Sequence, residues 1–241
     1  MPQHATADLA GRRVLGHDTH GKHLLTRFEG DLALHTHLRM EGSWMVTRPG
    51  KRLPARLMPD VRVLLVVDSG STAYGVLLPV VDLMRTSEEG TVVGHLGPDP
   101  LRDDWDAEEA VRRLRSDPDR PVVSALLDQR LVAGWGSLWA NELCFLRGIS
   151  PWTPVRDVDL PALVRLGARA LRHSATSPNA FQVTTGDRRR GEQHWVSGRA
   201  GRSCLRCGTA VRVVDAVPND PDQRRTWWCP VCQPGPPRPA G

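Results

Sequence analysis

"LLDQRLVAGWGSLWANELCFLRG", residues 126–148, is the stretch that decides the fold. Its apolar residues are typical of a buried helix, yet Gly134-Trp135-Gly136-Ser137 interrupts the run near its centre. Each glycine inside a helix costs roughly 1 kcal/mol relative to alanine. The pattern therefore predicts two helices, over 124–133 and 137–147, that meet at a rigid corner.

The corner itself suggests a chemical role. The first amides of the second helix have no partner within the helix and carry partial positive charge, so a phosphate can bind there. Gly134 and Gly136 would let a ligand approach the backbone, and Ser137 could cap the helix and touch a phosphate oxygen. The alternative interpretation is an ordinary buried helical hairpin with no ligand.

Two further helices are indicated on either side of this stretch. In the segment 105–117, Asp106 is the expected N-cap, and Glu109 three residues later would complete a capping box. In the segment 159–174, Asp159 is the expected cap and Pro161 lies in the first turn. The spacing of apolar residues predicts one buried face on this last helix, which consists of Leu160, Leu163, Val164, Gly167, Ala168 and Leu171.

In the first hundred residues the apolar positions recur with a different period. The segment 31–38 alternates in the manner of a half-buried strand, and 61–67 and 75–83 are short runs rich in β-branched residues. Several short strands in succession predict a sandwich or a barrel.

The composition limits the class of protein. The chain has 241 residues, 40% of them hydrophobic, and a net charge of +5, which suits a globular protein. No apolar run of about 18 residues exists, so we expect no membrane partner. The first residues contain no apolar signal sequence, so we expect a cytoplasmic protein.

The cysteines predict a metal site. Cys204 and Cys207 form one CxxC pair, Cys229 and Cys232 form a second, and Cys144 lies apart in an apolar helix as a buried thiol. Two such pairs match a tetrahedral structural site for one Zn²⁺ with no open coordination position. A pair of redox motifs is the alternative, but it would need a thioredoxin-like context. The residues between the two pairs can form a two-stranded ribbon.

Basic residues gather near this site. Between Gly186 and Cys207 the chain has only two acidic residues, Asp187 and Glu192, but six arginines: Arg188, Arg189, Arg190, Arg199, Arg202 and Arg206. This excess of positive charge suggests either a polyanion partner or a solvated loop. Trp227 and Trp228 precede the second CxxC pair, where they can cover the ribbon core or stack on bases.

Taken together, these motifs resemble one family, the formamidopyrimidine-DNA glycosylase and endonuclease VIII enzymes of base excision repair, in its actinobacterial endonuclease VIII-like branch. The stretch 126–154 resembles the helix-two-turns-helix motif of that family, and 19–25, 34–44 and 94–101 resemble its β-domain motifs. "CLRCGTAV" and "QRRTWWCPVCQ" resemble its zinc finger. The resemblance implies damaged DNA as the partner of a monomer in the bacterial cytosol or nucleoid.

The resemblance also implies residue roles. Lys22 would hold the phosphate beside the lesion, Met40 would fill the gap left by a flipped base, and Arg224 would grip the flanking backbone. An apolar wedge and phosphate clamps would offset the cost of extruding a base. Ser137 departs from the family, which has an asparagine at this position of the corner.

The beginning of the sequence departs further. Family members use an N-terminal proline as nucleophile and a following glutamate to move protons. This chain begins Met1-Pro2-Gln3, but the segment "ATADLAGRRVL" resembles a part of the family that follows the first helix. We therefore expect that the catalytic start is missing, that Pro2 is at most a weak candidate nucleophile, and that this chain cuts DNA poorly. The expected cause is a start codon assigned too late; the alternative is a truncated relative.

The sequence thus predicts an α+β protein. We expect an incomplete N-terminal β-sandwich over 1–103 without its first helix, a helix-two-turns-helix domain over 104–195, a four-cysteine zinc ribbon over 196–234 and a disordered tail over 235–241.

The predicted function is that of a bifunctional DNA glycosylase and abasic-site lyase, which flips and excises oxidised bases and cuts the strand by elimination. The alternatives are a non-catalytic binder of damaged DNA and a zinc-ribbon factor for transcription or RNA; the latter leaves the β-domain motifs unexplained.

Overall fold

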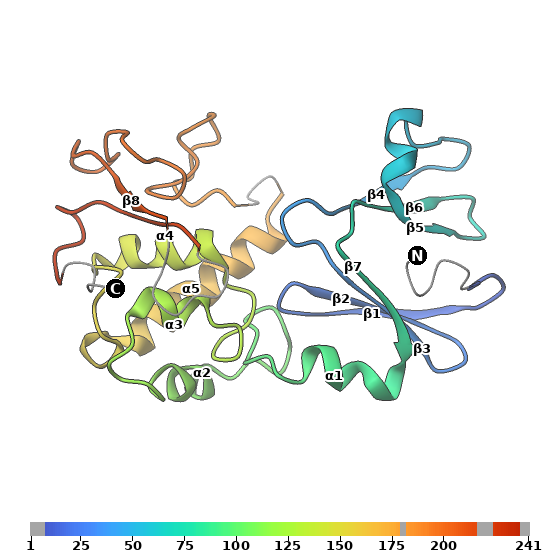
Figure 1. The fold of residues 1–241 in the computed structure, drawn as a ribbon, viewed down its shortest axis with the longest axis horizontal. Helices are drawn as coiled ribbons and strands as arrows, with labels where there is room; N and C mark the ends of the chain where they lie inside the picture. Colours follow the sequence, from blue (N-terminus) through green and yellow to red (C-terminus); the bar gives the residue numbers. More distant parts are fainter. Residues whose placement is uncertain (1–7, 179–181, 216–223, 237–241) are drawn as a thin grey trace. The chain divides into compact units, whose positions relative to one another are not determined.

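The computed structural model describes residues 8–178, 182–215 and 224–236 (Figure 1). The chain divides into two compact units, Met1–His95 and Leu96–Gly241. The first contains two β-sheets, and the second contains the longer helices and a small ribbon. The α+β class with a β-sandwich is confirmed.

The sandwich consists of two antiparallel sheets. One has the strand order β1-β2-β3-β7 and the other β4-β6-β5. The first sheet is built from β1 (Val14–His20), β2 (His23–Phe28), β3 (Leu32–His37) and β7 (Val80–Arg85). The second is built from β4 (Ser43–Thr47), β5 (Val61–Val66) and β6 (Thr72–Val76). A hollow of about 990 Å³ is lined by residues of both sheets.

Two expectations for the strands need correction. The run 75–83 is not one strand: Leu77 has a φ of +50° and Pro79 follows, so the chain turns and passes from β6 in one sheet to β7 in the other. The strand at 31–38 is not half-buried, because β3 lies between β2 and β7 and has buried residues on both faces. His35 is therefore a buried histidine.

Short helical turns complete the first unit. They are the 3₁₀ helices η1 (Ala55–Asp60) and η2 (Thr86–Glu88) and the α-helix α1 (Glu89–Val93). Arg27 on β2 binds the Glu89 carboxylate through Nε and Nη2, both at 2.7 Å, and so ties α1 to the first sheet.

The second unit is built around one large apolar core. Its helical elements are α2 (Ala107–Leu114), α3 (Val122–Leu127), α4 (Ser137–Arg147), η3 (Val155–Asp157) and α5 (Leu160–Thr176). The predicted apolar face of α5 is buried at every position. The α4 helix matches its expected range, Ser137–Arg147, and ends at Gly148, whose φ of +67° suits the left-handed C-terminal turn.

The ends of α2 and α3 differ in detail from expectation. Asp106 caps α2 by accepting the amides of Glu108 and Glu109, but the Glu109 carboxylate binds Arg112 and Arg113 instead of completing a capping box. The helix α3 ends at Leu127, because Asp128 is extended and its carboxylate accepts the Arg130 amide at 3.1 Å. Such local side-chain bonds compete with helix propagation.

The C-terminal part is a ribbon with a small core. The strands β8 (Arg212–Val214) and β9 (Thr226–Trp228) pair antiparallel, as expected for the residues between the CxxC pairs. Trp227 packs with Phe145 and Val196, and the Trp228 ring lies 5.8 Å from that of Trp152. Both tryptophans therefore cover the core, which favours a packing role for them over stacking on bases.

Candidate nucleic-acid interface and metal centre

Lys22 and the segment before Met40 lie at the same edge of the first sheet. Lys22 occupies the turn between β1 and β2, after Gly21, whose φ is +60°. In the register, His23 at the start of β2 is opposite His37 at the end of β3. The β-sheet thus brings the Lys22 turn and the loop after His37 together.

Met40 is presented at the apex of that loop. The amide of Gly42 donates to the carbonyl oxygen of Leu38 at 2.8 Å, and a Cβ at position 42 would lie 2.8 Å from that oxygen. The turn therefore requires glycine. Met40 is 96% exposed, so its side chain is accessible to a partner.

The corner predicted at residues 134–137 is present in the second unit. Gly134 has a φ of +90°, and its amide donates to the Gln129 side-chain oxygen at 3.1 Å. Trp135 is fully buried and packs against α5 at Gly167. A Cβ at position 167 would lie 2.4 Å from the indole ring. Gly167 is hence a residue whose role the apolar pattern alone did not reveal.

The role of Ser137 in capping is a correction. Gly136, in an extended conformation, is the N-cap of α4, and Ser137 is the first helical residue. The Ser137 hydroxyl donates to the carbonyl oxygen of Arg225 at 3.3 Å, so it faces the ribbon. No side chain of the described residues caps α4, which leaves its first-turn amides available for an anion.

Asn141 fixes the ribbon beside this helix end. Its Oδ1 accepts the Trp227 amide at 2.9 Å, and its Nδ2 donates to the carbonyl oxygens of Ser137 at 2.6 Å and Arg225 at 3.5 Å. Arg224 donates from Nη1 to the carbonyl oxygen of Leu127 at 3.3 Å, at the end of α3. The structure thus brings Arg224 together with Gly134, Gly136 and Ser137, which the sequence placed far apart.

Glu142, the next residue, was also missed from the sequence. It is 0% exposed, and its carboxylate accepts the backbone amides of Trp195, Val196 and Ser197, each at 2.9 Å, and the Thr184 hydroxyl. A buried carboxylate needs such donors. The segment 182–197 is therefore attached to α4 through one side chain.

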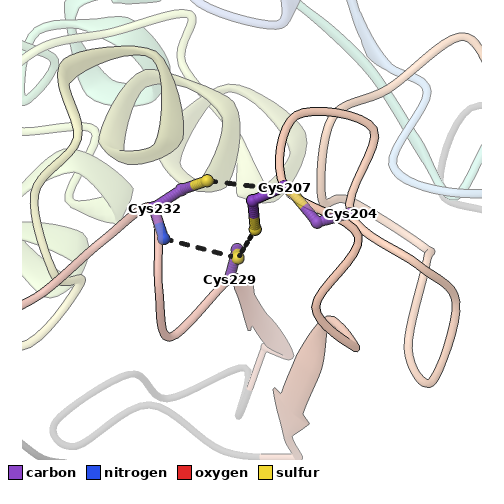
Figure 2. A group of neighbouring side chains, drawn as sticks. All are labelled: Cys204, Cys207, Cys229 and Cys232. Carbon is purple, nitrogen blue, oxygen red and sulfur yellow. Dashed lines mark hydrogen bonds between the residues drawn. The ribbon is translucent and has the colours of Figure 1, made fainter.

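The four predicted cysteines converge on one point (Figure 2). Their sulfurs all lie within 4.8 Å of one another, with Cys204 to Cys232 at 3.9 Å and Cys207 to Cys229 at 3.4 Å. Zn–S bonds of about 2.3 Å would place tetrahedral sulfurs about 3.8 Å apart. Gly208, directly after the first CxxC pair, has a left-handed conformation with a φ of +77°. The residues therefore fit a metal ion held by four thiolates.

The environments of the thiols differ. Hydrogen bonding to Thr209 is the main cause that lowers the pKa of Cys207 to about 6, whereas burial raises the pKa of Cys232 to about 12. The backbone amides of Arg206 and Cys232 point at Sγ of Cys204 and Cys229, each at 3.4 Å. Burial also raises the pKa of Cys144 to about 12, as expected for an inert core thiol.

The arginine-rich segment is only partly available to a polyanion. Arg199 is buried, near the Glu192 carboxylate at 3.5 Å, and donates to the carbonyl oxygen of Ser203 at 3.0 Å. The Arg206 guanidinium lies 4.3 Å from the ring centroid of Phe145, a cation–π contact. Arg189 pairs with Asp187, while Arg188 and Arg190 are exposed. Half of the cluster therefore has a structural role.

Two expectations remain to be placed. Pro2 lies outside the described residues, so its position carries no argument. Within the described part of the chain, we find no helix with the length and apolar character required to cross a bilayer.

Comparison with family models gives two matches, one in each unit of the chain. Residues 1–75 match the formamidopyrimidine-DNA glycosylase N-terminal domain, and residues 96–172 match the formamidopyrimidine-DNA glycosylase H2TH domain. The second match contains the corner at 134–137.

Individual proteins are similar over almost the whole chain. The "Probable endonuclease 8 2" of Streptomyces coelicolor is 49% identical over 243 residues, which are 100% of this chain and 87% of that protein. The DNA-(apurinic or apyrimidinic site) lyase of Mycolicibacterium smegmatis is 39% identical, over 97% of this chain and 87% of that protein. The crystal structure of the MutM (Fpg) protein of Thermus thermophilus has a TM-score of 0.67 at 30% identity, over 94% of this chain and 85% of that one.

Proposed function

Because the chain belongs to the formamidopyrimidine-DNA glycosylase family, we propose that it acts in base excision repair as a DNA glycosylase and abasic-site lyase. It binds damaged DNA, removes an oxidised base and cuts the strand by elimination. The observation that carries the proposal is the α4 N-terminus, where uncapped amides lie beside Arg224. Such a helix end with an arginine next to it suits a phosphate.

The two units supply different contacts in this proposal. In the first, Lys22 binds a phosphate beside the lesion and Met40 fills the space of the extruded base. In the second, Gly134, Gly136, Ser137 and Arg224 bind the flanking backbone. Among the described residues we assign no nucleophile.

The cysteine site holds one structural zinc ion in this proposal. Four thiolates complete a tetrahedral shell and leave no position for substrate, so the ion would stabilise the ribbon and take no part in catalysis. Because β9 is bound to Asn141, an ordered ribbon keeps Arg224 beside α4.

A cleavage assay tests the activity. Duplexes with one labelled strand would contain a single abasic site, a single oxidised pyrimidine, or no damage. We expect cutting at the abasic site and at the oxidised base but not in the intact duplex. Selective binding of damaged duplex without cutting would indicate a non-catalytic binder, and equal affinity for all three duplexes would contradict both interpretations.

Salt dependence tests the phosphate contact of Arg224. Each phosphate contact to duplex DNA contributes about 0.9 to the slope of log affinity against log salt. Arg224→Ala should reduce affinity and lower this slope by about 0.9. The matched control is Arg115→Ala, an exposed arginine on the C-terminal side of α2. An unchanged slope in Arg224→Ala, with the metal still bound, would place Arg224 away from the DNA.

A further inference from the structure

Three histidines and one aspartate lie together in the first sheet, outside the contacts assigned above, and two of the histidines form a hydrogen-bonded chain with the aspartate. Side chains at alternate positions of β3 share a face, so His35 and His37 lie on the same side. His23 on β2 pairs with His37, and Asp82 on β7 pairs with His35. The register therefore gathers these four side chains across three strands.

Hydrogen bonds fix the order of donors and acceptors in this chain. His35 is 3% exposed, and its Nδ1 lies 3.2 Å from Oδ2 of Asp82. An ionised carboxylate only accepts, so His35 carries its proton on Nδ1 and its Nε2 is an acceptor. That Nε2 lies 2.8 Å from Nδ1 of His23. His23 must then donate from Nδ1, which leaves its own Nε2 as an acceptor.

The surroundings keep His23 neutral in the free protein. Burial is the main cause that lowers the pKa of His23 to about 4, and the neighbouring imidazoles add to the shift. Burial likewise lowers the pKa of His37, followed by the charges of Lys22 and Arg39. The titratable and charged groups that face these rings are His20, Lys22, His35, His37, Arg39, Asp82 and His95.

We propose that binding of DNA at the Lys22 turn is coupled to the uptake of one proton by the chain Asp82–His35–His23. This inference rests on the proposed function, in which Lys22 holds a phosphate. A phosphate oxygen accepts hydrogen bonds, and an anion there also offsets the charges of Lys22 and Arg39. Both effects favour a state in which the Asp82–His35–His23 chain has gained a proton and Nε2 of His23 is a hydrogen-bond donor.

The proton balance is simple. One solvent proton binds Nε2 of His23, while the proton on its Nδ1 stays in the 2.8 Å hydrogen bond to Nε2 of His35. His23 then carries the positive charge and donates from both ring nitrogens, and Nδ1 of His35 keeps its contact with the Asp82 carboxylate. The His23 end of the chain thus changes from acceptor to donor.

The sign of the pH dependence follows from this uptake. Since the complex binds one proton more than the free protein, lower pH favours the complex. For one linked proton, affinity should rise by up to about tenfold per pH unit as the pH falls from 7 to 5.

Calorimetry tests the inference directly. A 13-base-pair duplex with a tetrahydrofuran abasic analogue would be titrated into the protein at pH 6, in two buffers with different heats of ionisation. The difference in heat counts the protons taken up. We expect an uptake of close to one proton for the wild-type chain at this pH. His23→Gln should abolish this uptake and flatten the pH profile of affinity, and Asp82→Asn should weaken it.

His17→Gln is the matched control. His17 lies on the neighbouring strand β1, and its Nδ1 is bonded to the Thr26 hydroxyl at 3.0 Å, outside the chain. It should keep the full proton uptake. Binding with the same uptake in His23→Gln and Asp82→Asn as in the wild type would overturn this inference and leave the proposed function standing. No binding of the abasic duplex at any pH would overturn both.

Discussion

Single residues differ in how far the sequence could identify them. The cysteines were identified by spacing, because two CxxC pairs specify a metal site locally. Glu142 and Asp82 were not identified, because each acts on a segment that is distant in sequence. A carboxylate in a helix or a strand does not by itself reveal whether water or buried amides surround it.

Met40 can be tested without disturbing the fold. Its side chain is 96% exposed, so Met40→Ala should leave the melting temperature unchanged. If Met40 replaces a flipped base, the variant should lose about tenfold in selectivity for damaged over intact duplex. Binding competition between the two duplexes measures this. The control is Met58→Ala, an exposed methionine in η1, which should keep the selectivity; equal losses in both variants would refute the wedge role.

Glu142 should be a determinant of stability. Glu142→Ala leaves three buried amides without their acceptor, and each unsatisfied group costs about 1–3 kcal/mol. We expect a loss of about 3 kcal/mol or more in urea unfolding. The control is Glu108→Ala, an exposed residue of the first turn of α2, with an effect below about 0.5 kcal/mol. A similar small effect in Glu142→Ala would show that the segment 182–197 is held in another way.

At the scale of elements, the spacing of apolar residues predicted the buried face correctly where a single element packs against a single core. The buried face of α5 followed directly from its apolar spacing. The end of α3 did not, because Asp128 stops the helix through a side-chain bond while Val132 beyond it remains buried. The division of 75–83 into two strands also depends on a chain reversal, and apolar content alone does not show it.

The packing of α5 against the corner gives an element-scale prediction. Alanine at 167 would favour the helix by about 1 kcal/mol. However, its Cβ would lie 2.4 Å from Cζ2 of the buried Trp135 and 3.0 Å from Leu143, and such overpacking costs about 1–3 kcal/mol. Gly167→Ala should therefore lower the unfolding free energy. Gly90→Ala in α1, where a Cβ meets nothing within 4 Å, is the control; a stabilised Gly167→Ala would contradict the close contact.

At the scale of the whole molecule, each unit has its own means of stabilisation. The second unit has a large helical core, but its ribbon has only a small cluster around Phe145 and Val196. Small modules of this kind usually need a metal. Fold class was predictable because strands precede helices along the chain, whereas the attachment of the ribbon to α4 was not, since it depends on Asn141 and one backbone carbonyl.

Removal of the metal should release the ribbon while the helical core persists. We expect one zinc ion per chain by elemental analysis of reduced protein, and a chelator should reduce DNA affinity with little change in helical circular dichroism. Metal binding displaces protons from the thiols, so the affinity of the site for zinc should fall as the pH is lowered. The cysteines whose pKa is raised by burial, such as Cys232, contribute most to this dependence. The control is Cys144→Ala, which should retain the metal; a chain without zinc that still binds DNA fully would contradict the assignment.

The adjacent residues Asn141 and Glu142 affect which parts of this protein can change in sequence during evolution. Both recognise mainly main-chain groups, the carbonyl of Arg225 and the amides of Trp227 and of residues 195–197. Main-chain groups are the same whatever side chain a position bears. The segments that these two residues hold can therefore exchange side chains, and so alter what they contact, while they remain attached to α4. Two positions on one helix thus hold the segments beside it without restricting their side chains.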